Sequence, residues 1–503
     1  MIDQYKSLSE KFLKKGFWLY LFSFIIAPIG YIVKIIISGD ISVSELGILY
    51  GIISLITLVS AYNDLGMSES INYFIPKFVT EKRYDKVKTI LVFAFIAQMI
   101  TGISIALFFF FGADFIATNY FKSLEAIEIL KVFAFYFLGI NIFQILSIFF
   151  MATQNTFANK ISEFIRMLFI LISVFSLYFL NIGSLENYSY AWIVGLYIGI
   201  IFIVNLFYFR YYKKYLIDKK ILWDKYLFYK IFRYAIIVFI GAQASTILGQ
   251  IDMQMIIYLL GTTDAGYYTN YLSIVSIPFM IIIPIFALLF PVFSELHSKG
   301  EIEKIKTTKE IFIKVFLAVG LMFNIFFFVF AEKIAFILFG EKYLTSGIIL
   351  KYSVLFLIFN FLLQINFNIM AGIGKLKERV KILGLAIIFN TILNMAFIKL
   401  FGVAGAALAT AFGWILIFVL SEISLGKKYR VNFDFKIIFK NIIFLGVGGI
   451  LFYYFGIGFF ENLSRFQSFG LLFLFSIIWF LFFVGINYNM FKNFILEVKR
   501  LRK

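Results

Sequence analysis

The sequence predicts an all-α integral membrane protein of about 14 transmembrane helices, arranged as two six-helix repeat lobes followed by two C-terminal helices. The first observation is composition, because 62% of the 503 residues are hydrophobic, 70 are Phe and only 15% are charged. A soluble domain of ordinary size cannot bury that much apolar surface. The spans are expected to be helical, because lipid cannot satisfy the unpaired backbone groups of an open sheet edge.

Apolar segments long enough to cross a hydrocarbon core of about 30 Å recur from end to end, which is the second observation. The first follows a polar, basic leader, MIDQYKSLSEKFLKKG, which lacks the small-residue cleavage site of a secretory signal. The predicted spans are 16–38, 46–75, 88–111, 127–152, 161–182, 187–211, 230–260, 265–293, 311–331, 347–372, 380–400, 402–425, 437–460 and 468–490.

Lysine and arginine are concentrated in alternate loops, which predicts the topology. By the positive-inside rule, both termini and the 210–233 linker are expected in the cytoplasm, with the chain in the cell (inner or cytoplasmic) membrane. The net charge of +18 then suits membrane lipids with anionic headgroups. No nucleic-acid partner is expected, because the basic residues are spread over many loops. With no Cys and a single His, His297, no metal site and no cofactor are expected.

An internal repeat is the third observation. SELGILYG at 44–51 aligns with TDAGYYTN at 263–270, and MATQNTFANKI at 151–161 aligns with MAGIGKLKERV at 370–380, both at a shift of 219 residues. Six spans return the chain to its starting side, so the two copies have the same orientation. The predicted domains are an N-terminal lobe at 1–212, a cytoplasmic linker at 213–229, a C-terminal lobe at 230–426, and two extra helices with a basic tail at 427–503.

Several segments of this pattern resemble a known transporter superfamily. ELG before the second span, DLGMSESINYF within it and FGEKYLTSGIIL before the tenth resemble the multidrug/oligosaccharidyl-lipid/polysaccharide (MOP) exporters. The chain looks most like the polysaccharide biosynthesis branch, which includes flippases of O-antigen and related lipid-linked oligosaccharides. The resemblance implies two lobes around a central cavity that opens alternately to the two sides of the membrane. The predicted number of spans, fourteen, also resembles that of the lipid II flippases, whereas drug exporters usually have twelve spans.

The second predicted span carries an unusual number of polar residues. Ser60, Asp64, Ser68 and Asn72 recur every four residues and therefore share one helical face. Such a face must point into protein or water. Asp64 is either a structural partner of basic loops or a carboxylate that couples transport to Na⁺ or H⁺.

The first span offers a candidate for binding an anionic headgroup. Lys34 ends a line of mostly small residues that includes Ser23. The alternative is that Lys34 reaches the outer interface and the small residues pack against a neighbouring helix. The lipid II flippases that the chain resembles carry cations in the same region, which favours substrate binding by Lys34 and Ser23.

The remaining candidates lie mainly on predicted spans seven and ten. Gln243, Gln250 and Gln254 form one stripe, and Asp252 lies on the opposite face among small residues. Neutral amides suit sugar hydroxyls because they both donate and accept hydrogen bonds. Asn360 and Gln364 extend this amide-rich character. We therefore expect Gln243, Gln250, Gln254, Asn360 and Gln364 to contact substrate, and Asp252 to join Asp64 in ion coupling.

The sequence thus predicts a transporter and not an enzyme. A polysaccharide polymerase, the less favoured alternative, would need a sizeable outer loop with catalytic residues, and the loop at 112–126 carries few reactive groups. The expected cargo is a polyprenyl-diphosphate-linked oligosaccharide, and the expected partners are a polymerase and glycosyltransferases of the same pathway. A multidrug/cation antiporter and a lipid II-type flippase remain as alternatives.

Overall fold

The computed structural model describes residues 21–22, 24–222, 225–226, 228–229, 231–233, 235, 243–431, 435–492 and 494. Every regular element in these ranges is a helix, and twelve of the helices are long and apolar enough to span a membrane. The prediction of an all-α membrane protein is confirmed. Predicted spans 16–38 and 230–260 are missing from these twelve, and both include residues outside the described ranges.

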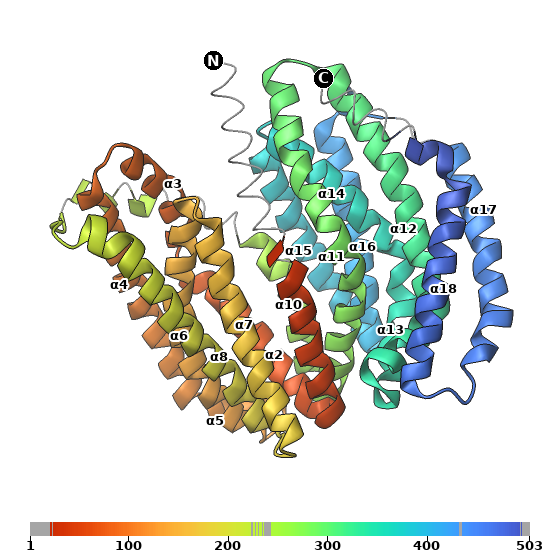
Figure 1. Cartoon of the computed structure of the whole chain (residues 1–503), viewed down its shortest axis with the longest axis horizontal. Coiled ribbons are helices and arrows are strands. Elements are labelled where there is room, and N and C mark those ends of the chain that lie inside the picture. Colours follow the sequence, from red (N-terminus) through yellow and green to blue (C-terminus); the bar gives the residue numbers. More distant parts are fainter. Residues whose placement is uncertain are drawn as a thin grey trace. The chain divides into compact units, whose positions relative to one another are not determined.

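The chain divides into two compact units, Met1–Gly266 and Tyr267–Lys503, which we describe separately. A helix over 24–40 opens the first unit (Figure 1). It is followed by α2 (Val43–Asn63), α3 (Met67–Thr80), α4 (Tyr84–Phe111), α5 (Ala113–Ile116), η1 (Ala117–Phe121), α6 (Ala126–Ala152), α7 (Thr156–Phe179), α8 (Leu185–Phe207), η2 (Tyr208–Leu216) and α10 (Ala244–Leu259).

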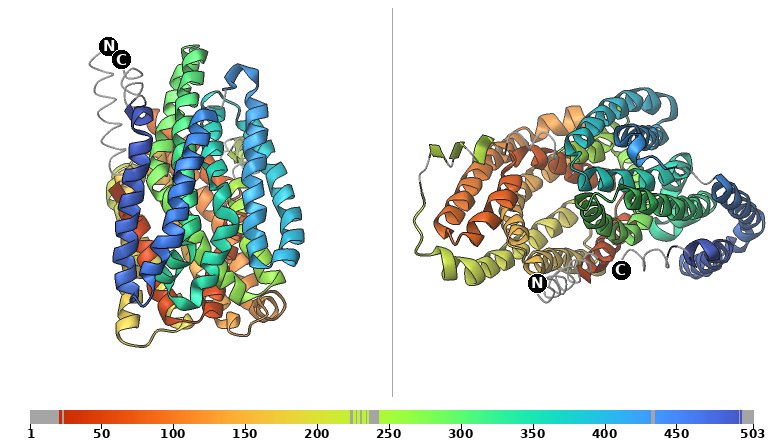
Figure 2. Two further views of the ribbon diagram at one scale, coloured as in Figure 1. Left: turned by 90° about the vertical axis from the view of Figure 1, so that its right-hand side faces the viewer. Right: turned by 90° about the horizontal axis from the view of Figure 1, so that it is seen from above.

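The second unit begins in the first turns of α11. Its elements are α11 (Thr262–Ser298), α12 (Ile302–Phe339), η3 (Glu341–Tyr343), α13 (Leu344–Ser353), η4 (Val354–Phe356), α14 (Leu357–Gly372), α15 (Leu376–Phe401), α16 (Val403–Leu425), η5 (Lys427–Tyr429), α17 (Phe435–Leu451), η6 (Phe452–Gly456), η7 (Ile457–Phe460) and α18 (Arg465–Ile486). α15 and α16 are joined through Gly402 alone and pack side by side, and α17 contacts α18 near the end of the chain (Figure 2).

A buried ion pair links two helices of the second unit. Lys309 on α12 is fully buried, and its Nζ lies 2.7 Å from a carboxylate oxygen of Glu422 on α16. The same amine donates to the carbonyl oxygen of Tyr429 at 3.3 Å. An unpaired charge would be costly at this position, so the pair holds α12 against the end of α16.

The compact units do not divide the chain where the sequence repeat does. α10 was assigned to the C-terminal lobe from the sequence, and in the structure it packs against α2 in the first unit. The domain limits at 212, 229 and 426 describe the repeat and remain a prediction.

The second predicted span, 46–75, is interrupted, so the expectation of one continuous helix was wrong. α2 ends at Asn63 and α3 begins at Met67. Between them, Leu65 and Gly66 have φ angles of 46° and 74°. These values lie in the left-handed region, which a right-handed helix cannot contain. The four-residue spacing of Ser60, Asp64, Ser68 and Asn72 therefore does not define one helical face.

Two glycines related by the repeat, Gly47 on α2 and Gly266 on α11, allow the backbones of these two helices to approach closely. A Cβ at Gly47 would lie 1.8 Å from the carbonyl oxygen of Thr262, and one at Gly266 would lie 2.0 Å from that of Val43. Gly47 matches Gly266, and Val43 matches Thr262, at the same shift of 219 residues. The contact is therefore symmetric under the repeat, and both positions require glycine.

Replacing Gly47 with Ala should lower the thermal unfolding temperature of the purified protein, because the added methyl group has no room. Overpacking of this kind typically costs about 1–3 kcal/mol. The matched control is Gly249→Ala on α10, where no described atom lies within 4 Å of the added Cβ. Equal unfolding temperatures for the wild type and Gly47→Ala would contradict the close contact.

Candidate functional site

Lys34 is buried within the first unit beside two aromatic rings. Its side chain belongs to the helix over 24–40, the residue is only 8% exposed, and its Nζ lies 4.4 Å from the centre of the Tyr50 ring. The Trp192 ring meets Tyr50 edge to face at 6.4 Å. The indole N–H of Trp192 is buried and has no hydrogen-bond partner among the described residues. A cation, an aromatic face and a spare donor are thus brought together, while Ser23 lies outside the described residues.

Asp64 occupies the interruption between α2 and α3. Its carboxylate accepts hydrogen bonds from the backbone N–H of Ser68 at 3.1 Å and from the Ser68 hydroxyl. The side-chain amide of Gln98 on α4 donates to the same carboxylate oxygen at 2.7 Å. Asp64 therefore ties the start of α3 to α4.

A pair of asparagines lies next to Asp64. Asn63 donates to the side-chain oxygen of Asn141 on α6 at 2.8 Å. The second polar atom of each amide, Asn63 Oδ1 and Asn141 Nδ2, is buried without a partner in the described part of the chain, as is Gln98 Oε1. Buried polar atoms are nearly always satisfied, so three such atoms in one place need an explanation.

The glutamine stripe of α10 faces α2. Ser54 donates to Gln250 Oε1 at 2.7 Å, and Gln254 donates to the Ser54 hydroxyl at 2.8 Å. The hydroxyl of Tyr120 donates to Gln254 Oε1, also at 2.8 Å. Gln254 is thus engaged in helix packing. Of the other candidates, Gln250 and Gln243 are half-buried, with Gln243 just before α10, and Asp252 is buried.

The second unit contains the remaining two predicted substrate contacts on one face of α14. Asn360 and Gln364 are both half-buried and lie one turn apart, with 3.5 Å between Gln364 Nε2 and Asn360 Oδ1. Asn366, on another face of α14, is fully buried and donates to the Ser421 hydroxyl of α16 at 2.8 Å. The first two amides are therefore partly exposed and lie in contact with each other along α14.

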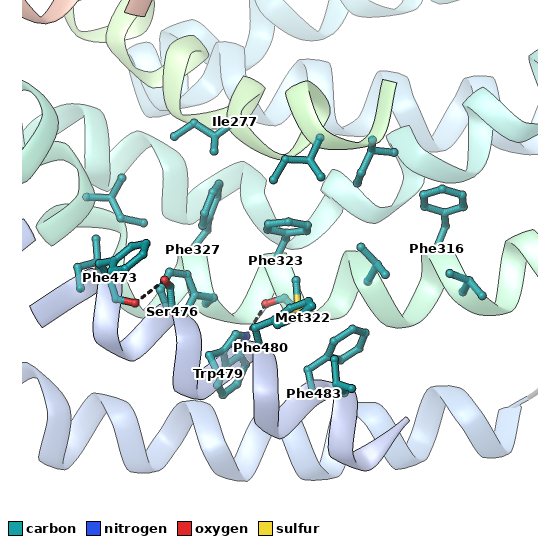
Figure 3. Close-up of a pocket in the computed structure, with 18 of the residues that line it drawn as sticks. Ile277, Phe316, Met322, Phe323, Phe327, Phe473, Ser476, Trp479, Phe480 and Phe483 are labelled. Atoms are coloured by element: carbon teal, nitrogen blue, oxygen red, sulfur yellow. Dashed lines mark hydrogen bonds between the residues drawn. The ribbon is translucent and has the colours of Figure 1, made fainter. Parts of the chain in front are cut away.

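An apolar groove of about 810 Å³ runs between α11, α12 and α18 (Figure 3). Ile277 contributes from α11, Phe316 and Phe323 from α12, and Phe473 and Phe480 from α18. Two lining side chains can donate hydrogen bonds, and both are already bound to backbone carbonyls. Ser476 donates to Phe473 at 2.7 Å, and Trp479 donates to Met322 at 3.0 Å. The groove therefore offers an apolar surface for a long hydrocarbon chain.

Sequence reasoning missed several residues that the structure places at these sites. Tyr50, Trp192, Tyr120 and Gln98 were not singled out. Gln98 did carry a signal, because an isolated glutamine in the apolar third span needs a partner. The aromatic residues carried none, because they are 21% of the chain and most of them simply contact lipid or other helices.

Comparisons with known proteins agree with this architecture. Residues 12–297, more than half of the chain, match the family described as polysaccharide biosynthesis protein. An uncharacterized membrane protein of Methanocaldococcus jannaschii is 28% identical over 448 residues, which are 85% of this chain and 86% of the relative.

Similar solved structures belong to transporters. The lipid II flippase MurJ in an inward closed conformation has a TM-score of 0.69 at 16% identity, covering 94% of this chain and 98% of that one. An inward-facing multidrug resistance transporter of the MATE family has a TM-score of 0.66 at 15% identity, with 80% and 96% covered. A transporter from Pyrococcus furiosus, described as having a binding pocket of reverse polarity, has a TM-score of 0.57 at 15% identity, with 83% and 97% covered. The chain belongs to the polysaccharide biosynthesis protein family and has the fold of the MOP superfamily transporters.

Proposed function

We propose that this protein flips a polyprenyl-diphosphate-linked oligosaccharide, such as an O-antigen or capsule repeat unit, from the cytoplasmic to the outer leaflet by alternating access. The observation that carries the proposal is the apolar groove between α11, α12 and α18. Of these three helices, α18 lies outside the two predicted six-helix repeats. A polyprenyl chain is apolar along its length and therefore suits such a surface. Membership of the polysaccharide biosynthesis family supports the same class of cargo.

The surroundings of Lys34 suit the polar end of this cargo. A diphosphate cannot enter an apolar bundle without compensation, because a bare ion costs many kcal/mol there. The Lys34 amine supplies opposite charge, and the Tyr50 ring below it supplies an apolar face of the kind that packs against sugar rings. The spare N–H of Trp192 is a donor for a sugar hydroxyl or a phosphate oxygen. Ser23, Gln243, Gln250 and Gln254 of the first unit and Asn360 and Gln364 of the second unit also remain proposed substrate contacts.

Ion coupling forms part of the proposal. Asp64, in the interruption after α2, and Asp252, on α10, are buried carboxylates that binding of Na⁺ or H⁺ would neutralise. A ligand shifts a two-state equilibrium only by its differential affinity for the two states, so the ion must bind one orientation of the transporter better. The glycosyltransferases that build the lipid-linked cargo and the polymerase that uses it are the proposed pathway partners.

Deletion of the gene should stop surface display of the glycan while its lipid-linked precursor accumulates in the cytoplasmic leaflet. Surface labelling together with extraction of the lipid-linked pool measures both quantities. Re-expression of the wild type should restore display. Normal glycan display combined with loss of drug resistance would instead favour a multidrug antiporter.

Replacing Lys34 with Gln should slow flipping by about tenfold to a hundredfold, the range expected for loss of a charge-assisted contact of about 1.5–3 kcal/mol. Lys34→Arg should retain more activity because it keeps the charge. The matched control is Lys131→Gln, which removes a partly exposed lysine from the same unit. Flipping is measured in vesicles containing the purified protein. Normal flipping by Lys34→Gln would place the headgroup elsewhere.

Polar substitutions in the groove should selectively impair cargo with a long prenyl chain. We expect Phe473→Gln combined with Phe480→Gln to slow flipping of a long-chain substrate and to have less effect on a short-chain analogue. Leu481→Gln is the control, because Leu481 is exposed on α18 but does not line the groove. Equal slowing of both substrates, or an equal effect of Leu481→Gln, would contradict a role of the groove in binding the chain.

A further inference from the structure

The two copies of the sequence repeat treat one cation differently. Lys160 on α7 corresponds to Arg379 on α15 at the shift of 219 residues. In the first copy, Lys160 Nζ lies 2.8 Å from a carboxylate oxygen of Glu163, one turn along the same helix. In the second copy, Ile382 stands at the position that matches Glu163. The cation is therefore neutralised within its own helix in the first copy only.

The preceding helices, α6 and α14, differ in polarity along one face. Asn360, Gln364 and Asn368 recur every four residues on α14, and all three are half-buried. The matching residues of α6, all of them buried, are Asn141, Ile145 and Phe149. The second copy thus combines a partly exposed polar face with a cation that lacks the intrahelical partner.

Arg379 lies against this polar face of α14. Its guanidinium carbon is 4.7 Å from the centre of the Phe367 ring. Phe367 follows Gln364 by three residues and Asn360 by seven, so it projects from the same side of the helix. A helical side chain leans toward the N-terminus of its helix. The Phe367 ring, with the guanidinium over it, therefore lies beside the turn that carries Gln364.

The hydrogen-bonding groups of Arg379 remain available in this position. Stacking on a ring uses the face of the guanidinium, whereas its five N–H donors lie in its plane. Within the described part of the chain, no carboxylate forms an ion pair with Arg379 and no oxygen accepts a hydrogen bond from its side chain. A cation that is half withdrawn from water without a counter-ion lowers stability, and an anionic ligand would reverse that cost.

We propose that Arg379 binds a phosphate group of the cargo, and that Asn368, Gln364 and Asn360 bind the sugar hydroxyls beside it. The inference rests on the proposed function and adds to it a headgroup site within the second unit. The guanidinium fork matches phosphate oxygens in a bidentate manner. The amides match hydroxyl groups, because an amide both donates and accepts hydrogen bonds.

The depth of Arg379 suits a cargo that is still in the cytoplasmic leaflet. α15 has 26 residues. At about 1.5 Å per residue it is longer than a hydrocarbon core of about 30 Å, so its first turn reaches the level of the lipid phosphates. Lys375, Lys377 and Lys381 accompany Arg379 there, and the positive-inside rule predicts a cytoplasmic location for this segment. Lys375 donates to the carbonyl oxygen of Ser424, and the other two lysines are exposed, so Arg379 is the cation that meets α14.

The test measures binding of polyprenyl diphosphate to the full-length protein, purified in detergent. Arg379→Gln should weaken binding by about tenfold or more, because it removes a bidentate, charge-assisted contact. Arg379→Lys keeps the charge without the fork, so its affinity should lie between those of Arg379→Gln and the wild type. The matched control is Lys377→Gln, which removes an exposed charge from the same turn and should bind like the wild type.

The repeat supplies an independent variant. Ile382→Glu places a carboxylate where the first copy has Glu163, and the new ion pair should weaken binding as much as Arg379→Gln does. Ile382→Gln adds a polar group of similar shape without the charge and should bind more tightly than Ile382→Glu. Ile382 is buried, so the unfolding temperature of each variant is measured first. If the Ile382 variants do not fold, Arg379→Gln and Lys377→Gln decide.

Two further probes identify the source of the phosphate and the role of the amides. Asn368→Leu should weaken binding of polyprenyl diphosphate that carries N-acetylglucosamine more than binding of bare polyprenyl diphosphate. Phosphatidylglycerol and inorganic pyrophosphate should compete poorly with either compound. Effective competition by phosphatidylglycerol would assign Arg379 to an ordinary lipid headgroup, and effective competition by pyrophosphate would assign it to a soluble anion. Either result would overturn the proposed site.

A purely structural role of Arg379 predicts that Arg379→Gln unfolds at a lower temperature and binds polyprenyl diphosphate normally. That result, an equal loss of binding in Lys377→Gln, or no binding by the wild type would also overturn the site. The proposed flipping is tested separately, by accumulation of the lipid-linked precursor after deletion of the gene. Normal accumulation together with unchanged binding in Arg379→Gln would therefore reject this site and leave the proposed function intact.

Discussion

Hydrogen bonds between buried polar side chains determine how the helices of this apolar protein pair. Lipid is as apolar as leucine, so apolar side chains gain little by choosing one another over lipid. Polar side chains must find partners inside the protein, because lipid offers none. Ser54 with Gln250 and Gln254 sets the register of α2 against α10, and Asp64 with Gln98 sets that of the interrupted helix against α4. Lys309 with Glu422 does the same for α12 and α16.

The glycines refine this pairing by allowing the backbones to approach closely. At Gly47 and Gly266 even a methyl group would collide with a carbonyl oxygen of the facing segment. The two contacts exchange under the sequence repeat, so one packing solution is used twice. Hydrogen bonds and close backbone contacts together hold α2 against α10 and against the start of α11 in the first unit.

The polar and apolar features suit different parts of one amphipathic cargo. The first unit contains a buried cation above an aromatic ring, with a spare indole N–H nearby. The second unit contains an apolar groove whose polar lining groups are already bonded, and an accessible pair of amides on α14. A charged headgroup, a set of sugar hydroxyls and a hydrocarbon chain are the chemical groups that these surfaces match. The proposed function follows from this correspondence together with the family of the chain.

The sequence by itself determined that the protein lies in a membrane, that it is helical and that it contains an internal repeat. These properties depend on composition, on the length of the apolar segments and on a constant offset between similar segments. The sequence also indicated Lys34, Asp64 and Gln250 as unusual, because a polar residue in an apolar span is visible without a structure. Only the tertiary structure showed that the second span is interrupted, because left-handed φ angles at Leu65 and Gly66 do not follow from their apolar neighbours. Only the tertiary structure brought Gln98 and Asn141 to Asp64 and Asn63, and Tyr50 beneath Lys34. These partners lie on different helices, and which helices meet depends on packing throughout the unit, which no local pattern records.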